Sequence, residues 1–317
     1  MKYSKPAVEA VIFDMDNVLL DTRRSYLDAI RWTLQIYLTH GPVPLFHRGQ
    51  FSNNSLLLTA EDVNHFKLLG GFNDDWDCCY GLLIYLLRLP TEKRTLEELR
   101  KKMDLKALGE KCRRRPLGVN GIVKHFGRSP HVMIEKISRI FQEIYLGADL
   151  FQATERKKAI YWNKRGLIYN ERLIFKERLL QKLRAMKIRL GIATGRPQFE
   201  AVFSLKHFGI LQYFDALTTI DEVKKAEHEQ KQSLRKPHPY SLLQTAKKIG
   251  LERRFLYVGD LPDDILATHR AKAVLNIRSV AFPSHASDPE NTLMEIEKVR
   301  PDFMMKRPSE LLKIVKK

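Results

Sequence analysis

Residues 10–22 read AVIFDMDNVLLDT, an apolar run that ends on two carboxylates. Its first four residues are mostly β-branched or aromatic, which is typical of a buried parallel strand, and Asp14 and Asp16 follow directly. A strand of this kind delivers the polar residues that follow it to the carboxyl edge of its sheet. We therefore expect residues 9–14 to form the first strand of a parallel sheet.

After Tyr169 the sequence alternates short apolar runs with amphipathic helical patterns. The expected strands are residues 189–194, 216–219, 255–258, 274–280 and 302–305. The expected helices are residues 171–186, 198–207, 240–249, 264–271 and one that opens at Pro308. Such alternation with short connections is typical of an α/β fold with a doubly wound parallel sheet, whose ligands bind at the carboxyl ends of the strands.

Between these parts, residues 24–168 show helical periodicity. Helices are expected over residues 26–38, 60–68, 76–87, 96–108 and 132–145, with Pro/Gly-rich breaks at 41–44 and 115–118. The sequence thus predicts an interrupted α/β core, residues 1–23 and 169–317, with an inserted all-helical cap domain, residues 24–168. Because the insert begins just beyond the carboxyl end of the first strand, we expect it to lie above the ligand-binding edge of the sheet.

Composition excludes several classes of protein. The 317 residues carry 55 Lys+Arg and 37 Asp+Glu, a net charge of +18, and 44% hydrophobic residues are enough for a sizeable core. No apolar run reaches the ~18 residues of a membrane span. The first residues lack the uncharged apolar region of a signal peptide. Three cysteines without ligand spacing argue against a disulfide scaffold or a zinc site. We expect a cytoplasmic protein without a membrane partner.

Four polar motifs follow predicted elements in a fixed order. They are FDMDNVLLDT at 13–22, ATGRP at 193–197, KPHP at 236–239 and GDLPDD at 259–264. Together they resemble the motifs of the haloacid dehalogenase (HAD) superfamily of phosphohydrolases, which include DxDG[TV], KPxP and GDxxxD. The stretch KLLGGFNDDWD at 67–77 is similar to a subfamily IA-like branch of phosphatases with a helical cap inserted after the first motif. The resemblance covers both ends of the chain and implies a Rossmann-like HAD core.

Phosphoryl transfer needs an in-line nucleophile, charge neutralisation on three oxygens and a proton for the leaving oxygen. The resemblance implies that Asp14 is the nucleophile that forms an aspartyl phosphate. It also implies that Asp16 protonates the leaving oxygen and then deprotonates the hydrolytic water, while its backbone carbonyl helps to hold a metal ion. Clustered carboxylates repel one another unless a hard cation lies among them. We therefore expect Mg²⁺, with metal ligands Asp14, Asp16, Asp260 and Asp264, and we rank Asp263 below Asp264.

Thr194, Gly195 and Lys236 are expected to bind phosphate. The Thr194 hydroxyl and the Gly195 amide belong to a predicted strand-to-helix turn, and Lys236 adds a positive charge. Alternatively, Thr194 only caps the following helix. Arg196 is either a candidate substrate ligand or a solvated charge in the first turn of that helix.

Three positions depart from the family pattern. Asn17 replaces the usual glycine, which we expect to be tolerated because asparagine reaches left-handed backbone angles readily. Asp221 lies in a lengthened segment, residues 219–230, and remains a candidate for the site. His238 replaces a common aspartate, and we interpret it as a surface residue.

The insert adds candidate substrate contacts and an uneven charge. Its loop 67–75 contains Lys67 and Asn73 as candidate substrate ligands, although the glycines within it could simply end a helix. Residues 24–100 have a net charge of −1, whereas residues 101–168, with 16 basic and 6 acidic residues, have +10. A polyanion could bind there, but basic runs between helices are more often solvated faces.

We therefore expect a magnesium-dependent phosphomonoester hydrolase that acts through an aspartyl phosphate on a small phosphorylated metabolite. One alternative is a phosphomutase or phosphotransferase of the same superfamily, which would not release inorganic phosphate. Another alternative is a nucleic-acid end-processing or RNA-binding protein that uses the late basic segment, residues 101–168. Its affinity would fall steeply with salt. Nucleic acid is the less favoured partner.

Overall fold

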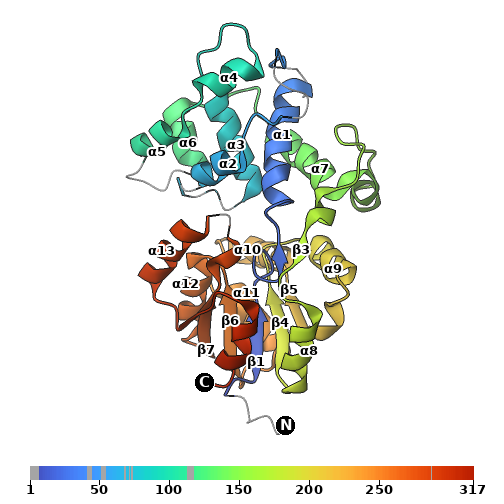
Figure 1. The fold of residues 1–317 in the computed structure, drawn as a ribbon, viewed down its shortest axis with the longest axis vertical. Coiled ribbons are helices and arrows are strands. Elements are labelled where there is room, and N and C mark those ends of the chain that lie inside the picture. The colour runs from blue at the N-terminus through green and yellow to red at the C-terminus, as the bar shows by residue number, and fades with distance from the viewer. Residues whose placement is uncertain are drawn as a thin grey trace. The chain divides into compact units, whose positions relative to one another are not determined.

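The computed structural model describes residues 7–40, 45–50, 55–67, 69–70, 72, 74–112, 118–286 and 288–317, and the side chains of residues 109–112 are not described. The chain forms two compact units. One comprises residues up to 22 together with residues 172–317, and we call it the α/β unit. The other comprises residues 23–171, and we call it the helical unit (Figure 1).

The α/β unit is built around a six-stranded sheet with the order β5-β4-β1-β6-β7-β8, in which every pairing is parallel. Its strands are β1 (Ala10–Phe13), β4 (Arg189–Ala193), β5 (Ala216–Thr218), β6 (Arg254–Gly259), β7 (Asn276–Ala281) and β8 (Phe303–Met304). The order reverses at β1, which lies between β4 and β6. The crevice for ligands in such a sheet lies at the carboxyl ends of these three strands. The predicted doubly wound sheet is confirmed.

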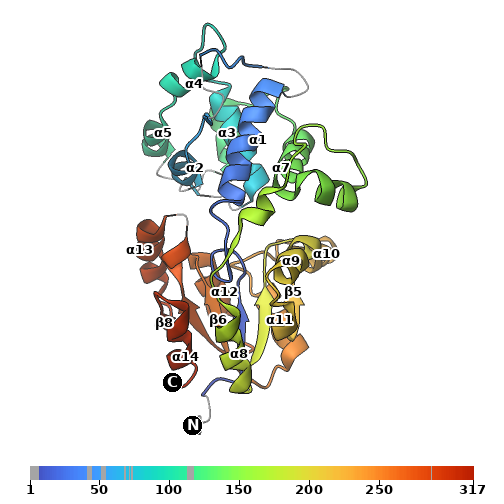
Figure 2. The same cartoon turned by 45° about the vertical axis from the view of Figure 1, so that its right-hand side comes forward.

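Strand β1 is fully buried because helices cover both faces of the sheet. Val11 and Phe13 belong to the core cluster that also contains residues of α8, α9 and α14. Ala10 and Ile12 belong to the cluster of the opposite face, with residues of α11 and α12. The five helices, seen in Figures 1 and 2, are α8 (Glu177–Ala185), α9 (Gln198–His207), α11 (Tyr240–Ile249), α12 (Pro262–Ala271) and α14 (Leu311–Ile314).

The helical unit contains no strand among its described residues. Its helices are α1 (Tyr26–His40), α2 (Ala60–Lys67), α3 (Asp75–Leu86), α4 (Leu96–Lys102), α5 (Leu105–Cys112), α6 (Gly118–Phe126), α7 (Ile134–Glu155) and the 3-10 helix η1 (Leu167–Asn170). Helix α1 packs against α3 and α7 (Figure 2). None of the helices in the described part of the chain has the length and hydropathy of a membrane span.

Two helix predictions in the insert differ from the structure. The single helix predicted over 96–108 is divided into α4 and α5 because Met103 is extended (φ −74°, ψ 126°). The helix predicted over 132–145 continues to Glu155, with a break at Gly147 (φ 79°). A Cβ atom at Gly147 would lie 2.2 Å from the Gly166 nitrogen, so a glycine allows the two backbones to meet. The break predicted at 41–44 and residues 115–117 of the break predicted at 115–118 lie outside the described residues, whereas Gly118 begins α6, a helix that the prediction missed.

Three predictions in the α/β unit also need correction. The helix predicted over 171–186 begins only at Glu177, because β3 (Arg172–Leu173) instead pairs antiparallel with β2 (Leu20–Asp21). The helix predicted at Pro308 is a 3-10 turn, η4 (Pro308–Glu310), followed by α14. The prediction missed two helices, α10 (Ile220–Gln230) and α13 (Pro289–Val299), as well as the 3-10 turns η2 (Leu211–Tyr213) and η3 (Pro283–His285). Helix α10 is mostly charged and buries only Val223 and Ala226, so its apolar periodicity is weak.

Candidate active site

Asp14 and Asp260 lie at the carboxyl ends of the neighbouring strands β1 and β6. The Asp14 amide donates to the Val258 carbonyl oxygen at 2.8 Å, so the parallel pairing continues one residue beyond β1. Asp260 directly follows the last residue of β6. Both side chains are buried, with 8% of Asp14 and 3% of Asp260 exposed. The sequence therefore places both carboxylates at the switch point of the sheet.

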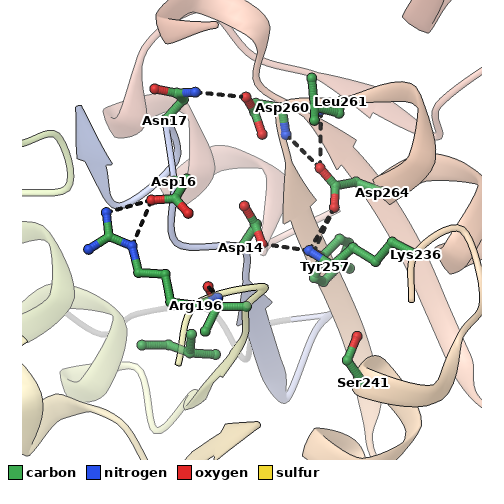
Figure 3. Close-up of polar contacts among 12 residues, drawn as sticks. Asp14, Asp16, Asn17, Arg196, Lys236, Ser241, Tyr257, Asp260, Leu261 and Asp264 are labelled. Carbon is green, nitrogen blue, oxygen red and sulfur yellow. Dashed lines mark hydrogen bonds and ion pairs between the residues drawn. The ribbon is translucent and has the colours of Figure 1, made fainter. Parts of the chain in front are cut away.

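Asp264, in the first turn of α12, is the third carboxylate of the site. Its Oδ2 accepts hydrogen bonds from the backbone amides of Asp260 and Leu261, both at 3.1 Å, and its Oδ1 accepts one from the Tyr257 hydroxyl at 2.9 Å (Figure 3). A Cβ atom at Gly259 would lie only 2.3 Å from the Asp264 Cβ. The glycine of the GDLPDD motif thus makes the room in which Asp264 lies.

Lys236 lies between two of these carboxylates. Its Nζ is 2.5 Å from Asp14 Oδ1 and 2.9 Å from Asp264 Oδ1 (Figure 3). Burial alone would lower the pKa of Lys236, but Asp14 and Asp264 together raise it well above its ordinary value. The site therefore contains a fixed cation.

The three carboxylates fit a hard metal ion. One oxygen each from Asp14, Asp260 and Asp264 lies within 4.8 Å of the other two. Burial raises the pKa of Asp14 to about 7, and repulsion from Asp264 and Asp16 adds to it while Lys236 opposes it. Burial, with repulsion from Asp264 and Asp14, likewise raises the pKa of Asp260 well above its ordinary value.

This electrostatic imbalance is what a second cation would relieve. A donor set made only of carboxylate oxygens suits Mg²⁺. Within the described residues, neither Asp263 nor the Asp16 side chain belongs to this group. We expect the backbone carbonyl of Asp16, and not its side chain, to bind the metal. The Asp16 carboxyl group can therefore take another role.

Asp16 pairs with Arg196. Arg196 Nε and Nη2 lie 2.8 and 2.5 Å from Asp16 Oδ1, and Nη1 donates to Ser204 Oγ at 3.1 Å. Only 1% of Arg196 is exposed, so the alternative of a solvated charge is wrong. Arg196 precedes α9 and does not lie in its first turn.

Thr194 and Gly195 form the turn between β4 and α9. Thr194 is buried, and its Oγ1 accepts a hydrogen bond from the Arg196 amide at 3.1 Å. Gly195 is exposed, and no atom beyond its own and those of its two chain neighbours lies within 4 Å of the place that a Cβ would take. The turn thus follows the carboxyl end of β4, next to β1, as expected from the motif.

Three residues, Asn17, Thr22 and Tyr257, add contacts that sequence reasoning missed. Asn17 has a left-handed φ of 55°, as expected, but its Nδ2 also donates to Asp260 Oδ2 at 3.4 Å. Thr22 Oγ1 donates to Asn17 Oδ1 at 3.1 Å and holds the amide group. The position of Asn17 in the first motif could have indicated that it belongs to the site. Tyr257 lies in the interior of a strand, and nothing in the sequence indicated its hydrogen bond to Asp264.

The remaining candidates lie in other surroundings. Asp221 Oδ2 accepts a hydrogen bond from the Gln198 amide at 2.7 Å and so caps α9. His238 is partly exposed, and its Nδ1 accepts from the Tyr240 amide at 3.2 Å at the start of α11. Lys67, in the helical unit, forms an ion pair with Asp75 at 2.6 Å. Asn73 lies outside the described residues.

Sequence comparisons point to one family of hydrolases. A family model described as haloacid dehalogenase-like hydrolase matches residues 8–272. The imidazoleglycerol-phosphate dehydratase of Phytophthora nicotianae is 24% identical over 269 residues, which are 84% of this chain and 42% of that protein. Pyrophosphatase PpaX of Bacillus pumilus is 30% identical over 137 residues, 43% of this chain and 56% of that protein. The chain thus spans about half the length of these curated relatives.

A solved structure agrees at the level of the fold. Phosphatase Tt82 from Thermococcus thioreducens matches with a TM-score of 0.58 and 22% identity, over 90% of this chain and 98% of the other. The family model spans most of the chain and includes all four motifs at the carboxyl edge of the sheet. The chain therefore belongs to the haloacid dehalogenase-like hydrolases.

Proposed function

We propose that the chain is a magnesium-dependent phosphomonoester hydrolase that acts through an aspartyl phosphate on a small phosphorylated metabolite. One observation carries the proposal: Asp14, Asp260, Asp264 and Lys236 converge in a buried cluster at the carboxyl ends of β1 and β6. Membership of the family and the relatives named phosphatase and pyrophosphatase support it.

In the first half of the reaction, an Asp14 carboxylate oxygen attacks phosphorus. A bond forms between that oxygen and phosphorus while the bond from phosphorus to the leaving oxygen breaks. Asp16 gives its proton to the leaving oxygen, so the product departs as an alcohol. Lys236 stabilises the negative charge on the phosphoryl oxygens, and the Thr194–Gly195 turn donates hydrogen bonds to them.

In the second half, the Asp16 carboxylate takes a proton from a water molecule. The water oxygen attacks the phosphorus of the aspartyl phosphate, and the bond between phosphorus and Asp14 breaks. Inorganic phosphate leaves, and Asp14 and the protonated Asp16 are restored. Asp14, Asp260 and Asp264 would hold Mg²⁺ together with the backbone carbonyl of Asp16, and the bound ion would neutralise carboxylate and phosphoryl charge.

The test is release of inorganic phosphate from an aryl phosphate, a panel of phosphorylated metabolites and pyrophosphate, in the presence of Mg²⁺. The unchanged protein should release phosphate, and Asp14→Asn should not. Asp215→Asn is the matched control, because Asp215 is a paired aspartate at the opposite edge of the same sheet. Full activity of Asp14→Asn would reject the proposal.

Pyrophosphate is a second candidate substrate because relatives named pyrophosphatase match 43–44% of the chain at 28–30% identity. A higher kcat/KM for pyrophosphate than for every monoester in the panel would favour it. A phosphomutase or phosphotransferase would instead move the phosphoryl group to a second acceptor. The cap role of residues 24–168 stays a prediction.

The nucleic-acid alternative rests on the late basic segment, residues 101–168. Part of this charge is already engaged: Arg139 pairs with Glu143 at 2.9 Å, and Lys164 and Arg165 lie over the rings of Trp162 and Tyr169. The densest run, residues 111–115, lies outside the described side chains. A steep loss of RNA or DNA affinity with salt would support this alternative, and flat, weak binding would reject it.

A further inference from the structure

The guanidinium of Arg196 is a buried charge next to a partly exposed carboxylate. Arg196 is 1% exposed, while 31% of the Asp16 side chain is exposed. Burying a cation costs free energy unless partners compensate for the lost hydration. Arg196 has such partners in Asp16 Oδ1 and Ser204 Oγ. Its hydrogen-bonding groups are therefore directed into the protein, and this argues against the candidate role of a substrate ligand.

The way in which Arg196 holds Asp16 is asymmetric. Nε and Nη2 both bind Oδ1, at 2.8 and 2.5 Å. Within the described part of the chain, Asp16 Oδ2 accepts no hydrogen bond (Figure 3). A guanidinium fork binds with fixed geometry and restricts the rotation of the carboxyl group. One oxygen of Asp16 is thus anchored, and the other is available.

The backbone fixes Arg196 in turn. Its amide donates to Thr194 Oγ1 at 3.1 Å, which holds the residue in the turn that follows β4. Ser204, on α9, anchors Nη1 at 3.1 Å from the other side. Arg196 is thus held between a strand end and a helix, on rigid elements of the α/β unit.

We propose that Arg196 is a positioning residue: it anchors Asp16 through Oδ1 so that Oδ2 is the atom that exchanges the proton with the leaving oxygen and with water. The inference rests on the proposed function, since the acid role of Asp16 is part of it. Arg196 itself touches neither the substrate nor the transferred proton. Because Arg196 fixes the Asp16 carboxyl group in advance, the reaction does not bear the entropy cost of orienting that group in each cycle.

The kinetic test compares an alkyl phosphate with an aryl phosphate, because a poor leaving group needs the proton more than a good one. Arg196→Met removes the fork, and Arg196→Lys keeps a cation. We expect kcat for the alkyl phosphate to fall about tenfold or more beyond the fall for the aryl phosphate in Arg196→Met, with KM little changed. Arg196→Lys should recover part of this loss.

Arg184→Met is the matched control, since Arg184 pairs with Asp215 in the same unit. It removes an arginine from an ion pair without touching the site, so it should leave the ratio of alkyl to aryl kcat as it is. Equal losses on both substrates in Arg196→Met would overturn the inference, because a merely structural arginine would affect both reactions alike.

A crystal structure of Arg196→Met gives a readout that does not depend on activity. The Asp16 carboxyl should leave its present place or occupy more than one conformer. An Asp16 side chain that keeps a single, unchanged place would overturn the inference whatever the kinetics. Absence of phosphate release by the unchanged protein would instead count against the proposed function, and the place of Asp16 in the crystal would still decide whether Arg196 positions it.

Discussion

Two aspartates at opposite edges of one sheet have opposite electrostatic surroundings. Asp215, just before β5, accepts a hydrogen bond from the Leu190 amide at 2.9 Å and pairs with Arg184 and Arg189. Burial acts to raise the pKa of Asp215, but the amide and both arginines lower it below its ordinary value. Asp14, at the carboxyl edge, has Lys236 beside it, yet burial and two neighbouring carboxylates raise its pKa to about 7.

This difference separates a carboxylate that stabilises the fold, Asp215, from one whose surroundings suit a reaction, Asp14. At the amino edge, the carboxylate charge is fully compensated, so Asp215 ties β4 to the start of β5. At the carboxyl edge, three buried carboxylates meet one lysine, and this leaves an excess of negative charge that a bound cation would relieve. Strongly shifted pKa values of this kind are typical of functional sites.

The largest expected effect is that of Asp14→Asn. We expect kcat for an aryl phosphate to fall by roughly 10³-fold or more, because the nucleophile is lost. Without Mg²⁺ the thermal midpoint should stay the same or rise, because one of several mutually repelling buried carboxylates is neutralised. Phosphate release and thermal unfolding measure the two effects. A large drop in the midpoint would show that Asp14 stabilises the fold as Asp215 does, and the contrast would fail.

Asp16→Asn should affect substrates unequally. The loss of a general acid costs about 10²-fold or more where the leaving group is poor. We therefore expect a large fall in kcat for an alkyl phosphate and a much smaller one for an aryl phosphate, measured as phosphate release. Equal losses on both substrates would remove Asp16 from the acid role.

Mg²⁺ should stabilise the protein through the carboxyl edge alone. At a concentration of 100 times Kd, a ligand that binds only the folded state adds about 2.7 kcal/mol. Thermal unfolding with and without Mg²⁺ should show this shift in the unchanged protein and in Asp215→Asn. Asp260→Asn, which lacks one carboxylate of the cluster, should show a much smaller shift. An undiminished shift in that variant would place the metal elsewhere.

Asp215→Asn should lower the free energy of unfolding by about 1–2 kcal/mol, because the charge-assisted hydrogen bonds from Arg184 and Arg189 are lost. The loss is no larger because both arginines are partly exposed to solvent. Urea denaturation measures the change. The kcat for an aryl phosphate should be the same as in the unchanged protein. A lower kcat with normal stability would show that the amino edge also takes part in the chemistry.

The smallest expected effect is the pH dependence of the difference in unfolding free energy between the unchanged protein and Asp215→Asn. The pKa of Asp215 is lower in the folded protein than in the unfolded chain. Its stabilising contribution is therefore present above the unfolded pKa of roughly 4, and it is lost as the pH falls through the folded value. The gap between the unchanged protein and Asp215→Asn should narrow on acidification below about pH 4. A gap that widens in acid would contradict the sign of the shift.

Local patterns were enough to predict the sheet and the position of the polar strand ends. Asp14 follows a buried apolar run and Asp260 follows another, and parallel strands bring both to one edge. Periodicity also predicted helices and no strands for the described residues of the insert. The catalytic and binding roles assigned to these residues stay predictions.

Long-range partners could not be predicted from the sequence. The burial of Arg196 depends on Asp16, 180 positions away in the chain, and on the turn that brings them together. The pairing of β2 with β3 joins segments on either side of the insert, and each is too short to give a periodic signal. Helix α10 was missed because a charged helix with two buried residues resembles a polar loop.

The most direct test of the central claim is the site of covalent phosphorylation. An acid quench during turnover of an aryl phosphate with Mg²⁺, followed by peptide mass spectrometry, would locate a trapped phosphoryl group. We expect that group on Asp14, and we expect none in Asp14→Asn. Steady release of phosphate with the phosphoryl group on another residue, or with full turnover by Asp14→Asn, would contradict the assignment of Asp14 as the nucleophile.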